Sequence, residues 1–145
     1  MSDFVIRKIE KDDYENYNNL INAFKPTNFS LQQYESMINM NVNTDIFVIE
    51  IFNNNENEKI LIGSGTILYE RKFIHNYGLI GHIEDIFIRE NYRIFGFGKK
   101  LIDHLMKEGR HKNCYKIILN CNKEIEKFYE KCGLKKNGIE MANYF

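Results

Sequence analysis

The sequence predicts one mixed α/β domain in which helices cover a central sheet. Its 145 residues suit a single hydrophobic core better than two. Segments with period-two apolar alternation and segments with helical apolar spacing follow one another along the chain. They predict the order strand, two helices, three strands, helix, strand, helix and strand. This order is typical of a sheet with helices packed on its faces.

Polar capping residues separate the elements in the first half of the chain. Asp12 and Asp13 can accept hydrogen bonds from the first amides of one helix, and Ser30 opens the next. Pro26, the only proline, ends the first of these helices. The predicted elements are strands at 4–9 and 45–52 and helices at 14–24 and 31–40.

Glycines mark several boundaries in the second half. Gly63 and Gly65 indicate a bulge or a close backbone approach inside a strand. Gly109 and Gly133 are placed to end two helices. The predicted elements are a solvated turn at 53–58, strands at 59–70, 82–88 and 114–121, a loop or hairpin end at 71–79, helices at 98–109 and 124–132, and a last extended segment at 139–145.

Composition excludes several classes of partner. Twenty basic residues against twenty acidic ones give no global field that would attract nucleic acid or an anionic membrane. Apolar stretches are short, and the start of the chain lacks the apolar core of a signal peptide, so we expect a cytoplasmic protein without a membrane span. The three cysteines lack any C-x-x-C spacing. We therefore expect buried thiols rather than disulfides or a metal site.

A short glycine loop precedes the helical pattern at 98–109. Its spacing, Arg93-x-x-Gly96-x-Gly98, would leave unpaired amides at the start of a helix, where the helix dipole adds positive charge. Arg93, Lys99 and Lys100 add further charge, so the loop fits a pyrophosphate. The competing interpretation is an ordinary turn. A dinucleotide fingerprint lacks its third glycine here, and the P-loop pattern is absent.

This loop resembles the Arg/Gln-x-x-Gly-x-Gly/Ala motif of the GNAT acyl-CoA N-acyltransferases. Further segments are similar to one branch of that family, the eukaryotic glucosamine-6-phosphate N-acetyltransferases. Together they span about half of the chain in the right order, whereas the first sixty residues match weakly. The similar segments are ERKFIH at 70–75, GHIEDI at 81–86, the loop itself, NCYKIILNC at 113–121 and KFYEKCG at 127–133.

The resemblance implies the GNAT fold and a defined reaction. It implies transfer of acetyl from acetyl-CoA to the 2-amino group of glucosamine 6-phosphate, by direct attack and without a metal, in the synthesis of UDP-N-acetylglucosamine. The residues that it implies for acetyl-CoA are Ile86, Phe87 and Ile88 along the pantetheine arm and the loop Arg93, Ile94, Phe95, Gly96, Phe97, Gly98 and Lys99 around the pyrophosphate.

Tyr129 is the implied proton donor to the departing thiolate. Periodicity alone favours a core aromatic residue on a helix face at this position, and the KFYEKCG match favours the catalytic role. Glu84 and Asp85 are the implied acids. On a regular strand adjacent side chains point to opposite faces, so we expect one of them to meet the sugar and the other to orient the backbone.

The remaining implied contacts are to the sugar and its phosphate, with Ile86 also beside the sugar. Lys72 and His75 match phosphate-binding positions, and Asn120 and Cys121 match a sugar-contacting acid–Cys pair. Because Asn120 replaces the usual acid, this position cannot accept the proton that the amine loses. We therefore expect Glu84 or water to accept that proton. In relatives an arginine from the partner of an intertwined homodimer reaches the phosphate, and Tyr144 stands in its place.

Three alternatives remain open from the sequence. The first is a GNAT enzyme that acts on another amine, such as a peptide N-terminus or a lysine. The second is a non-catalytic acyl-CoA-binding module, and the third is a nucleotide-binding regulator that uses the same glycine loop.

Overall fold

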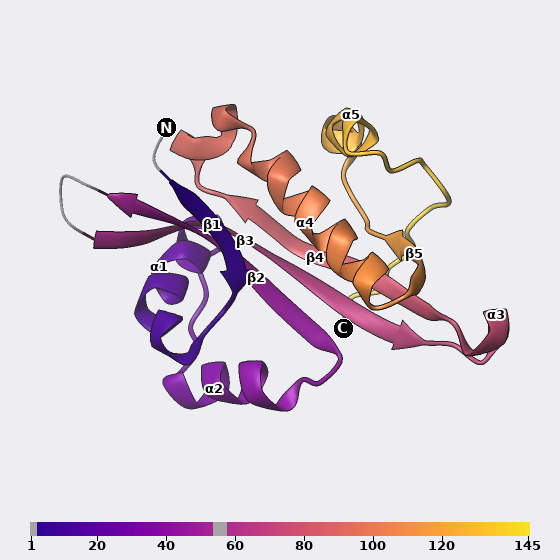
Figure 1. Cartoon of the computed structure of the whole chain (residues 1–145), viewed down its shortest axis with the longest axis horizontal. Helices are drawn as coiled ribbons and strands as arrows, with labels where there is room; N and C mark the ends of the chain where they lie inside the picture. Colours follow the sequence, from indigo (N-terminus) through magenta and orange to yellow (C-terminus); the bar gives the residue numbers. More distant parts are fainter. Residues whose placement is uncertain (1–2, 54–57) are drawn as a thin grey trace.

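A computed structural model describes residues 3–53 and 58–145 of the chain, without the side chain of Asn53. Its centre is a five-stranded sheet with the order β1-β2-β3-β4-β5 (Figure 1). Pairing is antiparallel from β1 to β4 and parallel between β4 and β5. The strands are β1 (Phe4–Lys8), β2 (Thr44–Asn53), β3 (Glu58–Arg71), β4 (Leu79–Ile88) and β5 (Cys114–Ile118).

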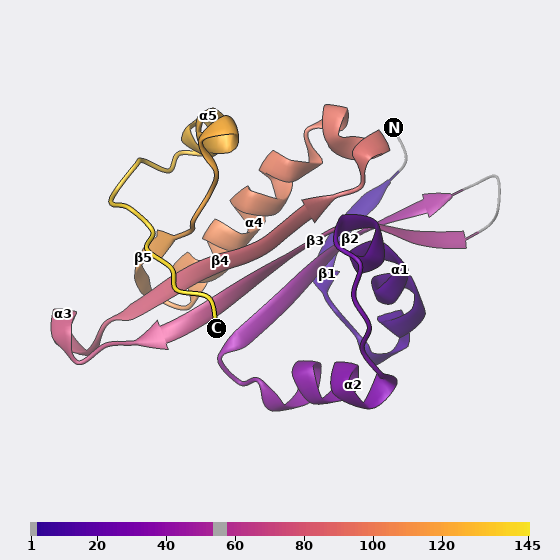
Figure 2. The ribbon, with the colours of Figure 1, turned by 180° about the vertical axis from the view of Figure 1, so that it is seen from behind.

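Helices cover both faces of this sheet, as the sequence predicts. The first two helices lie on one face, and the fourth and fifth lie on the other (Figures 1 and 2). None of the helices in the described residues has both the length and the apolar character that a membrane crossing requires. The helices are α1 (Tyr14–Phe24), α2 (Leu31–Met40), α3 (Ile74–Tyr77), α4 (Phe97–His111) and α5 (Glu126–Lys131), with 3-10 turns at Lys11–Asp13, Glu90–Phe95 and Lys123–Ile125.

The main hydrophobic core lies between α4 and the sheet. Leu101, Ile102 and Leu105 form the buried stripe of α4 that the helical spacing predicts, and each is fully buried. Full burial of one such side chain contributes about 1.5–3 kcal/mol. A smaller cluster on the opposite face contains Leu20 of α1 and Phe87 of β4. Because β4 contributes to both clusters, its position is fixed from two sides.

An ion cluster fastens the first strand to the turn before α1. Arg7 donates to both oxygens of Asp13, at 2.7 and 2.8 Å, and to Glu50 on β2. Burial opposes ionisation of Asp13, but hydrogen bonds from Arg7 and from the amide of Glu10 outweigh it and lower the pKa of Asp13. Asp13 therefore supports the turn rather than capping α1 through its side chain. Ser30 does cap α2, since its hydroxyl accepts from the amide of Gln33 at 3.2 Å.

Three expectations from the sequence are wrong. Gly109 is not a helix cap: it is buried inside α4, where an added Cβ would lie 2.3 Å from Cδ1 of Ile117. The helix continues to His111, and Asn113 takes the left-handed conformation with φ of 59°. The strand expected at 114–121 ends at Ile118 and is only partly buried. In the described residues the last segment, 139–145, belongs to no strand.

Other boundaries follow the sequence. Gly133 ends α5 with φ of 91°. Gly63 lies beside a register shift between β2 and β3, and an added Cβ there would lie 2.5 Å from Cδ1 of Ile88. The hairpin end between β3 and β4 is a left-handed turn with positive φ at His75, Asn76 and Tyr77. The solvated turn expected at 53–58 falls mainly on residues 54–57, which lie outside the described residues.

Candidate functional site

A β-bulge in β4 determines where its two acidic side chains lie. Ser64 pairs with Phe87 and Thr66 pairs with Glu84, so Asp85 and the residue after it stand opposite a single glycine. Asp85 has φ of 51°, which only a bulge or a turn accommodates. Glu84 and Asp85 consequently line the same cavity, of about 360 Å³. The expectation that they point to opposite faces is wrong, because it assumed a regular strand.

This first cavity has one apolar wall and one acidic wall. Its apolar wall comes from α1, α2 and the loop between them, and its sheet side carries the two acids. In the described part of the chain its lining contains no lysine or arginine. The lining outside β4 consists of Tyr17, Phe29, Gln33, Tyr34, Met37, Ile38, Ile46, Thr66 and Leu68.

Two tyrosine hydroxyls have separate roles beside this cavity. Tyr34 donates to the carbonyl oxygen of Glu10 at 2.6 Å, which ties α2 to the end of β1. The hydroxyl of Tyr17 lies 3.5 Å from the hydroxyl oxygen of Ser64, and burial raises the pKa of Tyr17. A protonated Tyr17 is therefore a hydrogen-bond donor at the cavity wall near Asp85.

Among the described residues, the end of β4 has no strand partner on the side of β5. Pairing between these strands covers only Leu79 to His82 of β4. Ile86, Phe87 and Ile88 lie beyond it, and on their other edge Phe87 and Ile88 pair with β3. Backbone groups at Ile86 and Phe87 are therefore available on this edge to an extended ligand.

The glycine loop leads directly into α4. Gly96 has φ of 75°, and an added Cβ would meet nothing within 4 Å. In the described residues no side chain caps the first amides of α4, so these amides are left without a side-chain acceptor at the helix start. Phe97, the first residue of α4, is itself buried. The loop thus fits an anion at the helix start.

The charges around the loop are already engaged. Arg93 donates from Nε to the carbonyl of Ile88 at 3.0 Å, so it holds the loop to the end of β4. Lys99 pairs with Asp103 at 2.6 Å, and Lys100 lies over the ring of Phe4. An anion bound here would meet backbone amides first and the shared charge of Lys99 second.

Gly98 has a packing reason to be glycine. An added Cβ would lie 3.2 Å from Cζ of Phe128, on the neighbouring α5. Gly98 therefore allows α4 and α5 to approach, whereas the open position in the loop is Gly96. Ile94 and Phe95, also in the loop, are exposed.

Tyr129 lies at a second cavity, of about 730 Å³, beside β5. The same cavity is lined by Asn120, Cys121 and part of the chain after α5. Only 9% of the tyrosine is exposed, and burial raises the pKa of Tyr129. Tyr129 is thus a core aromatic residue, as its helical spacing predicts, and it also lines the cavity that Asn120 and Cys121 line.

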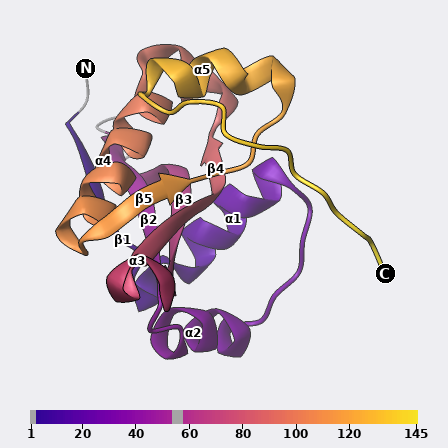
Figure 3. The same ribbon diagram turned by 90° about the vertical axis from the view of Figure 1, so that its right-hand side faces the viewer.

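Three residues that the resemblance implies for the phosphate lie apart from Glu84 and Asp85. They are Lys72, His75 and Tyr144. Lys72 donates to Glu70, and His75 packs on the ring of Tyr115 with centroids 4.4 Å apart. Neither residue lines the cavity of Glu84 and Asp85. Tyr144 is 93% exposed on the final segment, which runs away from the domain (Figure 3).

Sequence reasoning missed two features near the acids. The first is the contribution of Tyr17 and the apolar residues of α2 to the lining of the cavity. The second is a contact between Glu70 on β3 and His82 on β4, at 2.8 Å. The alternation of apolar residues predicts the strand in which each of the two lies. Their contact depends on the register between the two strands, which alternation does not predict.

Comparison with known proteins identifies the family of this chain. Residues 6–134 match the Acetyltransferase (GNAT) family. Glucosamine 6-phosphate N-acetyltransferase 1 of Dictyostelium discoideum is 34% identical over 140 residues, which cover 95% of this chain and 88% of the relative. Glucosamine 6-phosphate N-acetyltransferase of Arabidopsis thaliana is 40% identical over 85 residues, 59% of this chain and 57% of the relative.

Solved structures give the same result for the fold. The crystal structure of glucosamine-6-phosphate N-acetyltransferase from Arabidopsis thaliana superimposes with a TM-score of 0.86 at 32% identity. The match covers 99% of each chain. The protein therefore belongs to the GNAT acetyltransferase family and has the GNAT fold.

Proposed function

We propose that the protein transfers acetyl from acetyl-CoA to the 2-amino group of glucosamine 6-phosphate. The product, N-acetylglucosamine 6-phosphate, would serve UDP-N-acetylglucosamine synthesis. The observation that carries this proposal is the similarity to the Dictyostelium discoideum enzyme over 95% of the chain. A second support is the cavity whose two carboxylates, Glu84 and Asp85, come from the GHIEDI segment, because an acidic wall suits an amine substrate.

The residues present fit acetyl-CoA. A Cβ at Gly96 would occupy the open space before α4, where the pyrophosphate would accept hydrogen bonds from the amides of Phe97, Gly98 and Lys99. Ile94, Phe95 and Arg93 would complete this loop. The unpaired edge at Ile86, Phe87 and Ile88 would hold the pantetheine arm. Acetyl-CoA supplies an activated thioester carbonyl.

We assign proton transfer to two side chains, one at each of the two cavities. Tyr129 would donate a proton to the departing thiolate, and its raised pKa keeps the hydroxyl protonated at neutral pH. Glu84 would accept the proton that the amine loses, since Asn120 cannot. Asp85, beside Tyr17, would hold the sugar in the cavity, with Cys121 and the backbone of Ile86 as further contacts.

We further propose a homodimer that completes the phosphate site. Within residues 3–53 and 58–145, no lysine or arginine lines the acidic cavity, so a sugar phosphate needs charge from elsewhere. In the described residues the outer edge of β5 has no strand partner, and it borders the cavity of about 730 Å³. The final segment exposes Ile139, Met141 and Tyr144 almost completely. Exchange of this segment between two copies would pair the edge and bury these side chains.

In such a dimer, the phosphate would be bound by three residues that lie outside the acidic cavity, namely Lys72, His75 and Tyr144. Tyr144 would contribute a hydroxyl donor without charge. We propose a cytoplasmic location, in keeping with three free cysteines that form no disulfide among the described residues.

A substrate panel tests the proposed function. Thiol release from acetyl-CoA is measured with glucosamine 6-phosphate, glucosamine and a peptide amine in parallel. We expect the largest kcat/KM with glucosamine 6-phosphate. A larger value with the peptide amine would favour a GNAT enzyme for another acceptor. Acetyl-CoA binding without turnover on any amine would favour a non-catalytic module.

A further inference from the structure

We propose that His82, oriented by Glu70, receives the acceptor's proton from Glu84 and passes it to solvent. This inference rests on the proposed function and adds a residue to it. It starts from a pair outside both cavities: Nε2 of His82 lies 2.8 Å from Oε2 of Glu70. Glu70 belongs to β3 and His82 to β4, so the pair crosses between neighbouring strands.

His82 and Glu84 face the same side of the sheet. They are two residues apart in β4, and the bulge begins only after Glu84. Ile83 between them is buried in the α4 core, so its neighbours point away from α4. Leu68, the cross-strand partner of His82, lines the acidic cavity together with Glu84. His82 therefore lies one step along this face from the cavity.

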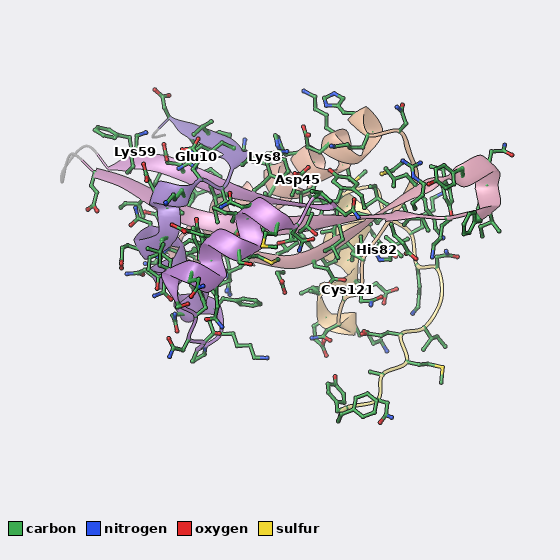
Figure 4. All side chains as sticks on the ribbon, turned by 90° about the horizontal axis from the view of Figure 1, so that it is seen from below. Lys8, Glu10, Asp45, Lys59, His82 and Cys121 are labelled. Atoms are coloured by element: carbon green, nitrogen blue, oxygen red, sulfur yellow. The ribbon has the colours of Figure 1, made fainter. Side chains whose placement is uncertain are left out.

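Part of this face is open to solvent. Figure 4 shows His82 on the sheet beyond the end of α2. Its side chain is 30% exposed, which is enough contact with water for a proton to leave. Residues two apart on a strand are about 7 Å apart, a distance that the Glu84 side chain or one water can bridge.

Glu70 fixes the state of the imidazole. Hydrogen bonds from Lys72 and then from His82 lower the pKa of Glu70, so this carboxylate remains ionised. An ionised carboxylate at Nε2 requires a hydrogen on Nε2, which leaves Nδ1 of a neutral ring as the acceptor. The same carboxylate then stabilises the imidazolium. This is the arrangement of a base held by a third group.

The nitrogen of the acceptor loses two protons on going from ammonium to amide. The second one, lost after the attack, replaces the proton that Tyr129 gives to the thiolate, so the first one must leave the site. The ammonium of the acceptor loses a proton to a carboxylate oxygen of Glu84, and its lone pair becomes free for attack on the thioester. Glu84 then gives that proton to Nδ1 of His82, and His82 gives it to solvent. His82 is partly exposed, whereas Glu84 lines the cavity, so a transfer to His82 carries the proton out toward solvent.

Other charges on this face enter the pH dependence. Beside His82 they are Glu70 on β3, Lys72 just after β3, Glu84 on β4 and Lys116 on β5. Lys116 pairs with the position two residues before His82, and its neighbour Ile117 packs under α4, so Lys116 points to the side of His82. Glu70 contacts both Lys72 and His82. The interaction between Glu70 and His82 therefore depends on the charges of both of these residues.

The test is the pH profile of kcat/KM for His82→Gln with glucosamine 6-phosphate. Glutamine keeps a donor for Glu70 but accepts no proton. We expect about a 10²-fold loss at pH 7. The loss should shrink as pH rises, because the amine is then already neutral. CoA affinity should not change. The matched control is His111→Gln, a histidine at the exposed end of α4 that should leave the profile unchanged.

Two further variants separate proton transfer from structure. Glu70→Gln should give an intermediate loss and move the acid limb of the profile. Added imidazole should restore activity to His82→Ala, which it would not do for a purely structural histidine. A His82→Gln profile parallel to that of the wild type at every pH would overturn this inference alone. A wild-type protein that acetylates no amine would overturn the proposed function and this inference with it.

Discussion

Glu84 and Asp85 are neighbours in β4, yet both line one cavity because Asp85 has φ of 51°. The bulge gives the site two acids on one wall and takes Asp85 and Ile86 out of the regular register with β3. Local conformation at a single residue thus connects the sheet to the chemistry.

The first prediction concerns this conformation. Asp85→Asn should keep the bulge, since asparagine tolerates positive φ, whereas Asp85→Val should lower the free energy of unfolding by about 1–3 kcal/mol. Urea unfolding of both variants checks this. Equal stability of the two variants would show that the left-handed conformation is not required.

The second prediction separates the two glycines of the loop. Gly96→Val places a side chain in the open space before α4 and strains a residue with φ of 75°, so it should raise the Kd for CoA at least tenfold, the effect of about 1.4 kcal/mol. Gly98→Ala should mainly lower stability, because its Cβ meets Phe128. Calorimetric titration with CoA compares them. Unchanged CoA affinity in Gly96→Val would exclude the pyrophosphate from this loop.

The third prediction concerns the proton donor. Tyr129→Phe should lower the single-turnover rate about 10²-fold with little change in CoA affinity. On the alkaline side, wild-type activity should fall only as pH rises through the raised pKa of Tyr129, where the proton donor is lost. The control is Tyr77→Phe, which removes a hydroxyl at the exposed hairpin end. Equal single-turnover rates in Tyr129→Phe and wild type would mean that Tyr129 contributes to packing and not to proton transfer.

The fourth prediction concerns stability at low pH. Burial opposes ionisation of Asp13 and Glu50, but hydrogen bonds from Arg7 outweigh it and hold the pKa of each carboxyl below its usual value. A depressed folded-state pKa adds stability above the unfolded value, near 4, and this stability is lost as pH falls below it.

Asp13→Asn tests this cluster. It should cost about 2 kcal/mol at pH 7, because Arg7 loses a charged partner in a half-buried position. The cost should shrink toward pH 3, where the wild type also loses the charge. Thermal unfolding across this range measures both. A difference that stays constant with pH would assign the effect to packing.

The fifth prediction concerns the final segment. Deletion of residues 139–145 should give a monomer by light scattering and lower kcat/KM for glucosamine 6-phosphate more than for glucosamine, since the phosphate contacts are lost. A deleted protein that keeps the mass of the full chain's assembly would contradict the exchange of this segment.

Local signals in the sequence predicted most of the fold. Ser30 and Gly133 act as a start and a stop because capping depends on a few neighbouring residues. The prediction that Gly109 caps a helix was wrong because this position is glycine for another reason. A side chain there would collide with Ile117, which belongs to the next strand. The last segment carries apolar residues that a strand would use, but no strand in the described part of this chain pairs with it.

The candidate site was predictable where a motif carries it. The loop from Arg93 to Lys99 lies at the start of α4 as its spacing predicts. The partners of its charges were not predictable, since Arg93 binds the carbonyl of Ile88 and Lys99 pairs with Asp103. The shared face of Glu84 and Asp85 depends on strand register, which no single segment specifies.

A crystal structure with CoA and glucosamine 6-phosphate tests the central claim most directly. We predict that the pyrophosphate accepts hydrogen bonds from the amides of Phe97 to Lys99, that the pantetheine arm lies along Ile86 to Ile88, and that the amino group of the sugar faces Glu84. Binding of CoA at another surface, or of the sugar away from the acidic cavity, would contradict it.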